Sequence, residues 1–286
     1  YHTSHSPCAD YHHGPPLNRI EIVSVLIMLW AKPDYACSRE SALPIATMGT
    51  SSPLIMEVFM AQADVEQEST ANATWSRMLQ GNRRFAEGKP DHPWQDKETR
   101  QTLLDGQNPD AAVLACSDSR VPPEIIFDEG LGDLFTVRTA GQLIDSAVIA
   151  SLEYAVKKLH VSLICVLGHE HCGAIEAATQ ELDDLMRTIT SEADGSLEAA
   201  DAMDDLDEHI ADAESIILRQ AGMSVWQARE AELKEHEDIE RVHVAHTIET
   251  LVEQSPVIQQ ALAADKLMIV GARYQLDSGK VEVLSF

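Results

Sequence analysis

The sequence is poor in basic residues. It has 286 residues, with 21 Lys or Arg against 47 Asp or Glu, so the formal net charge at pH 7 is −26. A field of that sign repels nucleic acid and anionic lipid, and we expect neither as a partner. It does not exclude a small anionic substrate or product, because salt screens charge beyond roughly 8 Å.

Cysteine is also scarce, and long apolar runs are lacking. The five cysteines are an odd number in a chain that is not short, which argues against a secreted disulfide framework and favours a reducing compartment. We therefore expect a cytoplasmic protein. No apolar run reaches the roughly 18 residues that span a bilayer, so we expect no membrane partner. The nearest case, residues 20–30, is too short, and the histidine-rich segment before it is not a basic leader.

The pattern of the chain changes near residue 70. Residues 1–70 show no sustained helical or strand period, and we expect them to form an irregular, poorly ordered N-terminal extension. Whether this segment is a genuine tail or results from a misplaced start site stays open. Residues 71–286 have regular patterns and are expected to form the working domain.

Within that domain, apolar residues at helical spacing predict a helix at 75–87, and a second helix is expected at 99–104. Short apolar runs predict strands, and a late edge strand follows a turn. Longer helices are expected between and after the strands. The predicted strands are 111–115, 134–137, 163–167, 267–270 and 280–284; the later helices are 146–159, the acidic stretch 191–240, and 241–264.

Strands buried on both faces and separated by helices imply a parallel sheet. We therefore predict an α/β fold with a mainly parallel central β-sheet flanked by helices. Residues 181–240 contain 19 Asp or Glu and 4 Lys or Arg, a net charge of −15. Solvated helical faces explain this excess, and an acidic interaction surface is the alternative.

Three candidate metal ligands follow predicted strands. Cys116 comes directly after the run at 111–115, and His169 and Cys172 follow the run at 163–167. Because ligands collect outside the carboxyl ends of strands in open parallel sheets, we expect the two loops to converge. Two thiolates and an imidazole suit Zn2+, and no good fourth Cys or His lies nearby. Three protein ligands leave one position for water, which is typical of a catalytic zinc.

The neighbouring residues have other interpretations. Cys165 lies within an apolar run, where a core position is more common than a ligand. His171 is adjacent to Cys172 and would point away if both stood on one turn. A metal-free alternative makes Cys116 a nucleophile with His169 as its base, although the second cysteine favours a metal.

Asp118 and Arg120 stand on either side of Ser119 in the segment CSDSR. Alternate residues of an extended segment share a face, so both side chains could look toward a metal beside Cys116. The carboxylate could occupy the open zinc position, or it could pair with Arg120 and leave that position to water. A structural salt bridge without metal contact is the third possibility.

The segment ACSDSRVPPEIIF, followed by GDLFTVRTAGQLID, SLEYAV and VLGHEHCGAI, strongly resembles the β-class carbonic anhydrases. GNRRF and the late VGARYQLDSGKV are also similar to the family, so the resemblance runs from about Trp75 to the C-terminus. CxDxR combined with a later HxxC after a strand is highly specific. The sequence departs from the family at Gln142, where an Asn is common.

The resemblance implies a carbonic anhydrase (carbonate dehydratase), a zinc lyase that reversibly hydrates carbon dioxide to bicarbonate and a proton through zinc-bound hydroxide. It implies that Cys116, His169 and Cys172 hold the zinc and that Asp118 and Arg120 form a catalytic dyad. In some family members the Asp swings onto zinc in an inactive state, which makes Asp118 a conditional fourth metal ligand.

The resemblance has further implications for substrate and partners. Gln107 lies nine residues before Cys116, where some members carry a substrate-contacting glutamine. The family fold includes an N-terminal helical arm that embraces a partner, so we expect a homodimer or a higher homo-oligomer with the active site near the interface.

Two other functions stay open at this point. The same fold could hydrolyse carbonyl sulfide or carbon disulfide, because the metal site would be identical. A non-catalytic zinc or bicarbonate-sensing module is the second alternative, although a purely structural site has no need of the CSDSR pair.

Overall fold

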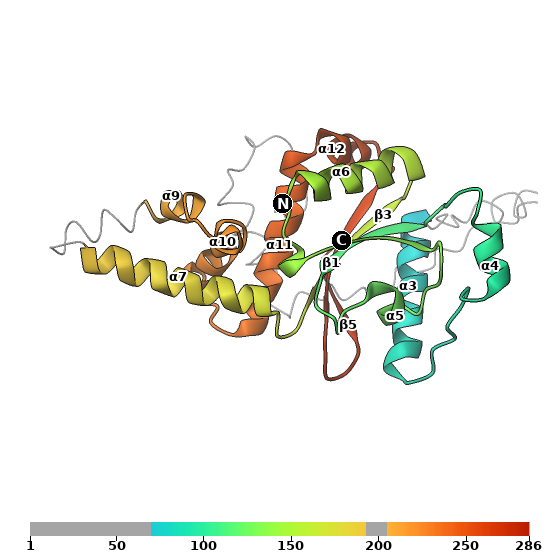
Figure 1. Cartoon of the computed structure of the whole chain (residues 1–286), viewed down its shortest axis with the longest axis horizontal. Coiled ribbons are helices and arrows are strands. Elements are labelled where there is room, and N and C mark those ends of the chain that lie inside the picture. Colours follow the sequence, from blue (N-terminus) through green and yellow to red (C-terminus); the bar gives the residue numbers. More distant parts are fainter. Residues whose placement is uncertain (1–69, 193–204, 286) are drawn as a thin grey trace, which may run out of the picture. The chain divides into compact units, whose positions relative to one another are not determined.

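The computed structural model describes residues 70–192 and 205–285, which belong to one compact unit. Apart from Thr70, the expected N-terminal extension lies outside these residues. A five-stranded sheet in the order β2-β1-β3-β4-β5 forms the centre (Figure 1). The strands are β1 (Ala111–Cys116), β2 (Leu134–Thr139), β3 (Leu163–His169), β4 (Met268–Tyr274) and β5 (Val281–Ser285).

The sheet is mainly parallel, as predicted. β1 pairs in parallel with both β2 and β3, and β3 pairs in parallel with β4. Only β5 is antiparallel, next to β4 at the edge. The predicted strand at each of the five apolar runs is therefore confirmed, including the late edge strand. The α/β fold class with a mainly parallel central sheet is confirmed as well.

The central strands β1 and β3 are buried on both faces, as their almost continuous apolar runs predict. Alternate residues of a strand point to opposite faces. Accordingly Ala111 and Val113 contact one core cluster, whereas Ala112 and Leu114 contact the other. Cys165 packs in the first cluster, and its side chain is fully buried.

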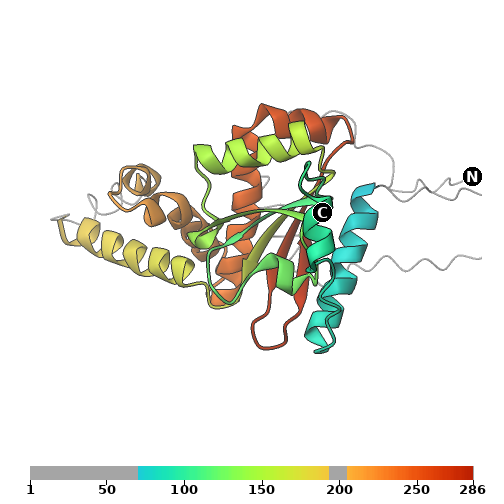
Figure 2. The same ribbon diagram turned by 45° about the vertical axis from the view of Figure 1, so that its right-hand side comes forward.

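Helices cover the two faces of the sheet. Trp75 and Met78 of α3, together with Phe127 after α5, pack on one face, and residues of α6, α11 and α12 pack on the other. Figures 1 and 2 show α3 and α11 on opposite sides of the strands. The helices of these layers are α3 (Thr70–Ala86), α5 (Pro123–Ile126), α6 (Ser146–Tyr154), α11 (His236–Gln254) and α12 (Pro256–Ala263). The short helix α4 (Lys97–Thr102) has no buried residue and belongs to neither layer.

A third apolar cluster joins α11 to the acidic region. It contains buried residues of α7 (Gly173–Glu192), α9 (Leu206–Ala211) and α10 (Ile216–Glu230), together with Cys116 and Cys172. Most described Asp and Glu side chains between 181 and 240 are exposed, as expected of solvated helical faces. Glu240 differs, because it is only 3% exposed.

The prediction of one helix over 241–264 is wrong. The structure has α11 and α12 instead, separated at Ser255. Pro256 provides no backbone donor and disfavours helical geometry at the preceding residue. Ser255 is accordingly extended, with φ −117° and ψ 98°, and its side chain caps α12 by accepting a hydrogen bond from the backbone N–H of Ile258.

The strand order places the functional end of the sheet. From β1 the chain passes to β2 on one side and then crosses to β3 on the other side of β1. In open parallel sheets, ligands bind at such a switch point, outside the carboxyl ends of the strands. Cys116 ends β1 and His169 ends β3, so both lie at this switch point. Among the described residues, no helix is long and apolar enough to cross a membrane.

Candidate metal centre

Cys116, His169 and Cys172 meet at the switch point. Their candidate ligand atoms all lie within 4.8 Å of one another, and the two sulfurs are 4.0 Å apart. All three residues are at most 4% exposed. The adjacent pairing of β1 and β3 brings Cys116 beside the His169 loop, and Cys172 immediately precedes α7. The predicted convergence of the two loops is therefore observed.

The donor set fits a tetrahedral zinc ion. With Zn–S distances of about 2.3 Å, tetrahedral geometry separates two sulfurs by about 3.8 Å, close to the observed 4.0 Å. The Nδ1 atom of His169 lies 2.8 Å from the carbonyl oxygen of Glu170, which can only accept a hydrogen bond. This contact leaves Nε2 as the free ligand atom, and Nε2 is buried without a hydrogen-bond partner. An orphaned buried nitrogen beside two thiols is the expected signature of a metal site.

Backbone donors surround the Cys116 sulfur. The N–H groups of Gly141 and Asp118 lie 3.2 and 3.4 Å from it. The contact with the Cys172 sulfur, together with these two N–H groups, outweighs burial and lowers the pKa of Cys116 to about 4. The same contact with Cys116, together with burial, raises the pKa of Cys172.

Asp118 and Arg120 form a bidentate ion pair. Arg120 donates from Nε to Asp118 Oδ1 at 2.9 Å and from Nη2 to Oδ2 at 2.6 Å, and its backbone N–H also donates to Oδ1. These hydrogen bonds from Arg120 hold the pKa of Asp118 well below its usual range. Arg120 Nη2 also donates to the carbonyl oxygen of His171, which ties the CSDSR segment to the His169 loop.

Arg138 is a site residue that the sequence analysis missed. It lies on β2 beside the end of β1, and it donates from Nε to the carbonyl oxygen of Cys116 at 2.9 Å and from Nη2 to that of Asp118 at 2.6 Å. It therefore fixes the backbone that carries both side chains. A charged residue directly after the predicted strand 134–137 was the available signal, because a part-buried charge requires partners.

Other predicted residues lie apart from the cluster. Cys165 is a core residue, and burial raises the pKa of its thiol. His171 is exposed and has a left-handed backbone with φ 51°, so the chain turns there between His169 and Cys172. Within the described residues, neither side chain belongs to the group of candidate metal ligands.

Gln107 is not brought to this cluster within one chain. It precedes β1, whereas Cys116 ends β1, so the two residues lie at opposite ends of the strand. Gln107 is exposed and lines a hollow of about 760 Å³ together with apolar residues of three other segments. Three large ones are substantially exposed there: Leu104 (80%), Leu131 (45%) and Tyr154 (48%).

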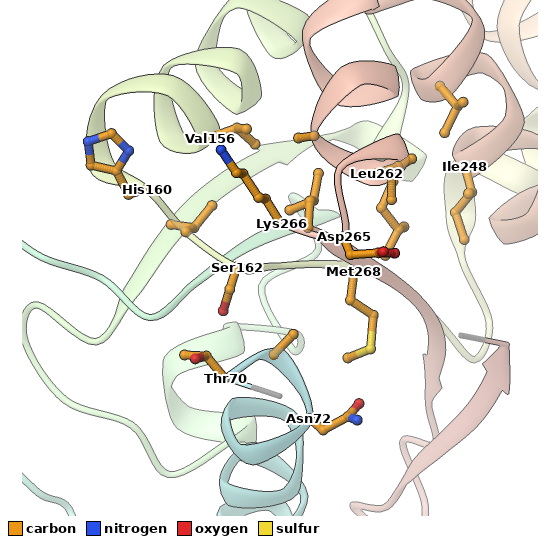
Figure 3. A pocket seen from close by; sticks show the side chains of 16 residues that line it. Thr70, Asn72, Val156, His160, Ser162, Ile248, Leu262, Asp265, Lys266 and Met268 are labelled. Carbon is orange, nitrogen blue, oxygen red and sulfur yellow. The ribbon is translucent and has the colours of Figure 1, made fainter. Parts of the chain in front are cut away.

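A second hollow, of about 820 Å³, lies at the amino ends of β3 and β4. In Figure 3, Thr70 and Asn72 at the start of α3 lie across it from Ser162 and Met268. Its walls are mostly apolar, and Lys266 is among its few charged residues. This hollow is at the opposite end of β3 from His169, and it has no part in the metal centre.

Comparisons with known proteins agree on one family. A sequence model of the carbonic anhydrase family matches residues 111–281. The chain is 41% identical over 208 residues to carbonic anhydrase 2 of Mycobacterium tuberculosis, covering 73% of this chain and 90% of the relative. It is also 41% identical over 213 residues to a carbonic anhydrase of Mycolicibacterium smegmatis, covering 74% and 93%.

The solved structures similar to this chain include the β-carbonic anhydrase CcaA. That structure is 28% identical, with a TM-score of 0.47, and the match covers 73% of this chain and 94% of CcaA. The family match spans both strands that end in the cluster, the CSDSR segment and the HxxC turn. The chain therefore belongs to the carbonic anhydrase family that this sequence model describes.

Proposed function

We propose that this protein is a carbonic anhydrase that hydrates carbon dioxide reversibly to bicarbonate and a proton, with residues 71–286 as the catalytic domain. The observation that carries the proposal is the buried Cys116–His169–Cys172 cluster beside the Asp118–Arg120 pair. Family membership supports the same activity. The cluster would hold Zn2+ through two sulfurs and one imidazole nitrogen.

When bound, zinc supplies Lewis-acid chemistry that makes water a nucleophile near neutral pH. The residues around it have separate tasks. Cys116 and Cys172 provide negative charge, and the Glu170 carbonyl orients the ring of His169 so that Nε2 faces the cluster. Burial of all three residues excludes bulk water from their side of the site.

Asp118 acts as a fixed hydrogen-bond acceptor in this proposal. Because Arg120 keeps its carboxylate ionised, Asp118 can accept a hydrogen bond and cannot donate one. It therefore selects and orients a group that presents a proton, such as the nucleophilic water. The same pairing keeps the carboxylate from being a free metal ligand. Its role as a conditional fourth ligand stays a prediction, since that state requires the Arg120 pair to open.

The test is to measure carbon dioxide hydration by the purified, zinc-replete chain in a stopped-flow instrument with a pH indicator. The zinc content of the same preparation is determined in parallel. We expect about one zinc per chain and rapid hydration. Zinc binding without hydration would support a structural or sensing module instead. Turnover of carbonyl sulfide or carbon disulfide should be measured in the same preparation, and faster turnover of either than of carbon dioxide would contradict the proposal.

The proposed assembly is a homodimer or a higher homo-oligomer. Exposed Leu104, Leu131 and Tyr154 surround Gln107, and β2 at the sheet edge is half-buried despite its apolar residues. An apolar surface of this kind is typical of an interface. A substrate contact by Gln107 requires a second copy, because its own chain holds it at the other end of β1 from Cys116.

Sedimentation of the wild type and of Leu131→Asp tests the assembly. We expect an oligomer for the wild type and a lower mass for the variant, because a buried carboxylate at an interface is costly. Ile216→Asp is the matched control, since Ile216 is an exposed residue of α10, outside this surface. A monomeric wild type would contradict the proposal. We also propose a reducing compartment such as the cytoplasm, because the described cysteines are free thiols.

A further inference from the structure

Helix α11 contacts the loop of Cys172 through a buried carboxylate. Glu240 accepts a hydrogen bond from the backbone N–H of Cys172 at 3.2 Å through Oε1, and its Oε2 accepts from Arg273 Nε at 2.8 Å. Glu240 and Arg273 are 3% and 2% exposed. Their ion pair therefore lies directly behind the turn that carries one of the two candidate sulfur ligands.

One turn later, the same helix contacts the surroundings of Cys116. His243 Nε2 lies 2.7 Å from the carbonyl oxygen of Gly141, and Nδ1 lies 2.9 Å from Ser224 Oγ. A carbonyl oxygen can only accept, so Nε2 carries the proton and the Ser224 hydroxyl donates to Nδ1. Gly141 in turn donates its N–H to Cys116 Sγ at 3.2 Å.

Burying the polar groups of Glu240 and His243 carries a desolvation penalty. Glu240 and His243 face the protein interior, where apolar residues of similar volume would avoid the desolvation penalty of a charge and an imidazole. Every polar atom of the two side chains has a partner, and one partner of each leads to a cysteine. In addition, Gly141 has a left-handed backbone with φ 63°, so a side-chain contact from α11 holds a turn that few residues could adopt.

We infer that Glu240 and His243 of α11 are positioning residues that set the geometry and donor strength of the two cysteine ligands, Glu240 through the N–H of Cys172 and His243 through Gly141. The inference rests on the proposed zinc site. Hydrogen bonds to a metal-bound sulfur reduce the charge that it donates and tune the metal. Loss of such partners typically weakens metal binding by about 10–100-fold.

Cobalt substitution tests the His243 branch without using activity. In the Co2+-loaded full chain, the thiolate-to-cobalt charge-transfer band reports the electron richness of the sulfurs. His243→Leu should move the band to longer wavelength and weaken Co2+ binding by about 10–100-fold. His243→Gln, whose amide can still donate to Gly141, should restore most of both properties. Ser224→Ala should shift the band less than His243→Leu.

Leu251→Ala is the matched control. Leu251 is buried on the same helix but packs in the sheet-facing cluster, so this variant lowers stability without touching the cysteine loops. Its band should coincide with that of the wild type. The inference is overturned if His243→Leu leaves the band unmoved, or if Leu251→Ala moves it equally. If His243→Leu does not fold, Ser224→Ala decides by the same criterion. A wild-type chain that shows no charge-transfer band would instead overturn the zinc site itself.

The Glu240 branch needs a pair of substitutions, because Glu240→Met alone removes the shortest and most buried carboxylate partner of Arg273. Arg273 then keeps only its longer contacts with Glu170, Glu237 and Glu282. In the double variant Glu240→Met with Arg273→Met, both charges are gone and an apolar pair replaces them. We expect recovered thermal stability but metal binding that stays about 10-fold or more below the wild type, since the Cys172 N–H has lost its acceptor. Recovery of wild-type metal affinity would show that Glu240 serves Arg273 alone.

Discussion

The two ends of the parallel sheet differ in how their polar groups are used. At the carboxyl ends of β1 and β3, an ionised Asp118 is fixed by Arg120, and the backbone around Cys116 is fixed by Arg138. At the amino ends, the hollow of Figure 3 has mainly apolar walls, although Asn72, Asp265 and Lys266 are among the residues that line it. The same strands support both ends, so burial and strand packing alone do not make a site.

The two ends also differ in whether hydrogen bonds or burial have the larger effect on the pKa of a carboxyl group. Near the carboxyl ends, hydrogen bonds from Arg120 outweigh burial and lower the pKa of Asp118. Near the amino end of β1, Arg77 links Asp110 to the buried Glu129, yet burial prevails there and raises the pKa of Glu129 to about 7. Preorganised donors therefore mark the functional end, and a volume of empty space does not.

The largest expected effect comes from removing a ligand at the carboxyl ends. Cys172→Ser should lose zinc and, with it, carbon dioxide hydration, because a serine hydroxyl is a poor substitute for a thiolate. The loss in zinc affinity should exceed the about 100-fold that removal of a hydrogen-bond partner costs. Cys165→Ala is the control: it also removes a buried thiol but should retain zinc. Equal zinc loss in both variants would contradict the ligand assignment.

Asp118→Asn should show the next largest effect. The amide keeps an acceptor oxygen but loses the charge that pairs with Arg120, so hydration should fall by about 100-fold or more. Zinc content should stay at the wild-type level, because the three ligands are untouched. A variant with full activity would reduce the Asp118–Arg120 pair to a structural salt bridge.

The sequence alone predicted the strands and the three candidate ligands, but not the residues behind them. Continuous apolar runs predict buried strands, and Cys116 and His169 directly end two of them. His243 lies 102 residues from Gly141, and Glu240 lies 68 residues from Cys172, so no local pattern links them. Their positions depend on how α11 packs against β3 and β4, which periodicity does not specify.

Two local signals could have improved the prediction. Arg138 and Arg273 interrupt strands that are otherwise largely apolar, and a buried guanidinium requires a carboxylate or carbonyl partner. Pro256 marks the break between α11 and α12, since the residue before a proline avoids helical geometry. A substrate contact by Gln107 could not be located within one chain, because the fold places Gln107 at the opposite end of β1 from Cys116.

A smaller effect is expected at Glu129. Because the folded chain holds this proton up to about pH 7, whereas an ordinary Glu releases it near 4.5, the folded state binds more protons in between. Stability should therefore fall as pH rises through that window, by about 3 kcal/mol at most. Glu129→Gln should flatten this slope. It should also raise the free energy of unfolding at pH 8 by about 2 kcal/mol, a value that allows for the lost ion pair with Arg77. Urea unfolding at pH 5 and 8 measures this change, and an unchanged slope would contradict it.

The smallest effect is expected at the amino-end hollow. Lys266 is exposed at its rim, so Lys266→Ala should change the free energy of unfolding by no more than about 0.5 kcal/mol and leave carbon dioxide hydration at the wild-type rate. Activity and urea unfolding of this variant should be measured beside Asp118→Asn. A comparable loss of activity in both would erase the distinction between the two ends.

X-ray absorption at the zinc edge of the loaded wild-type chain tests the central claim most directly. The ligand set of Cys116, His169 and Cys172 predicts two sulfur neighbours at about 2.3 Å and two nitrogen or oxygen neighbours at about 2.0–2.1 Å. A first shell with fewer than two sulfurs, or with a third sulfur, would contradict it.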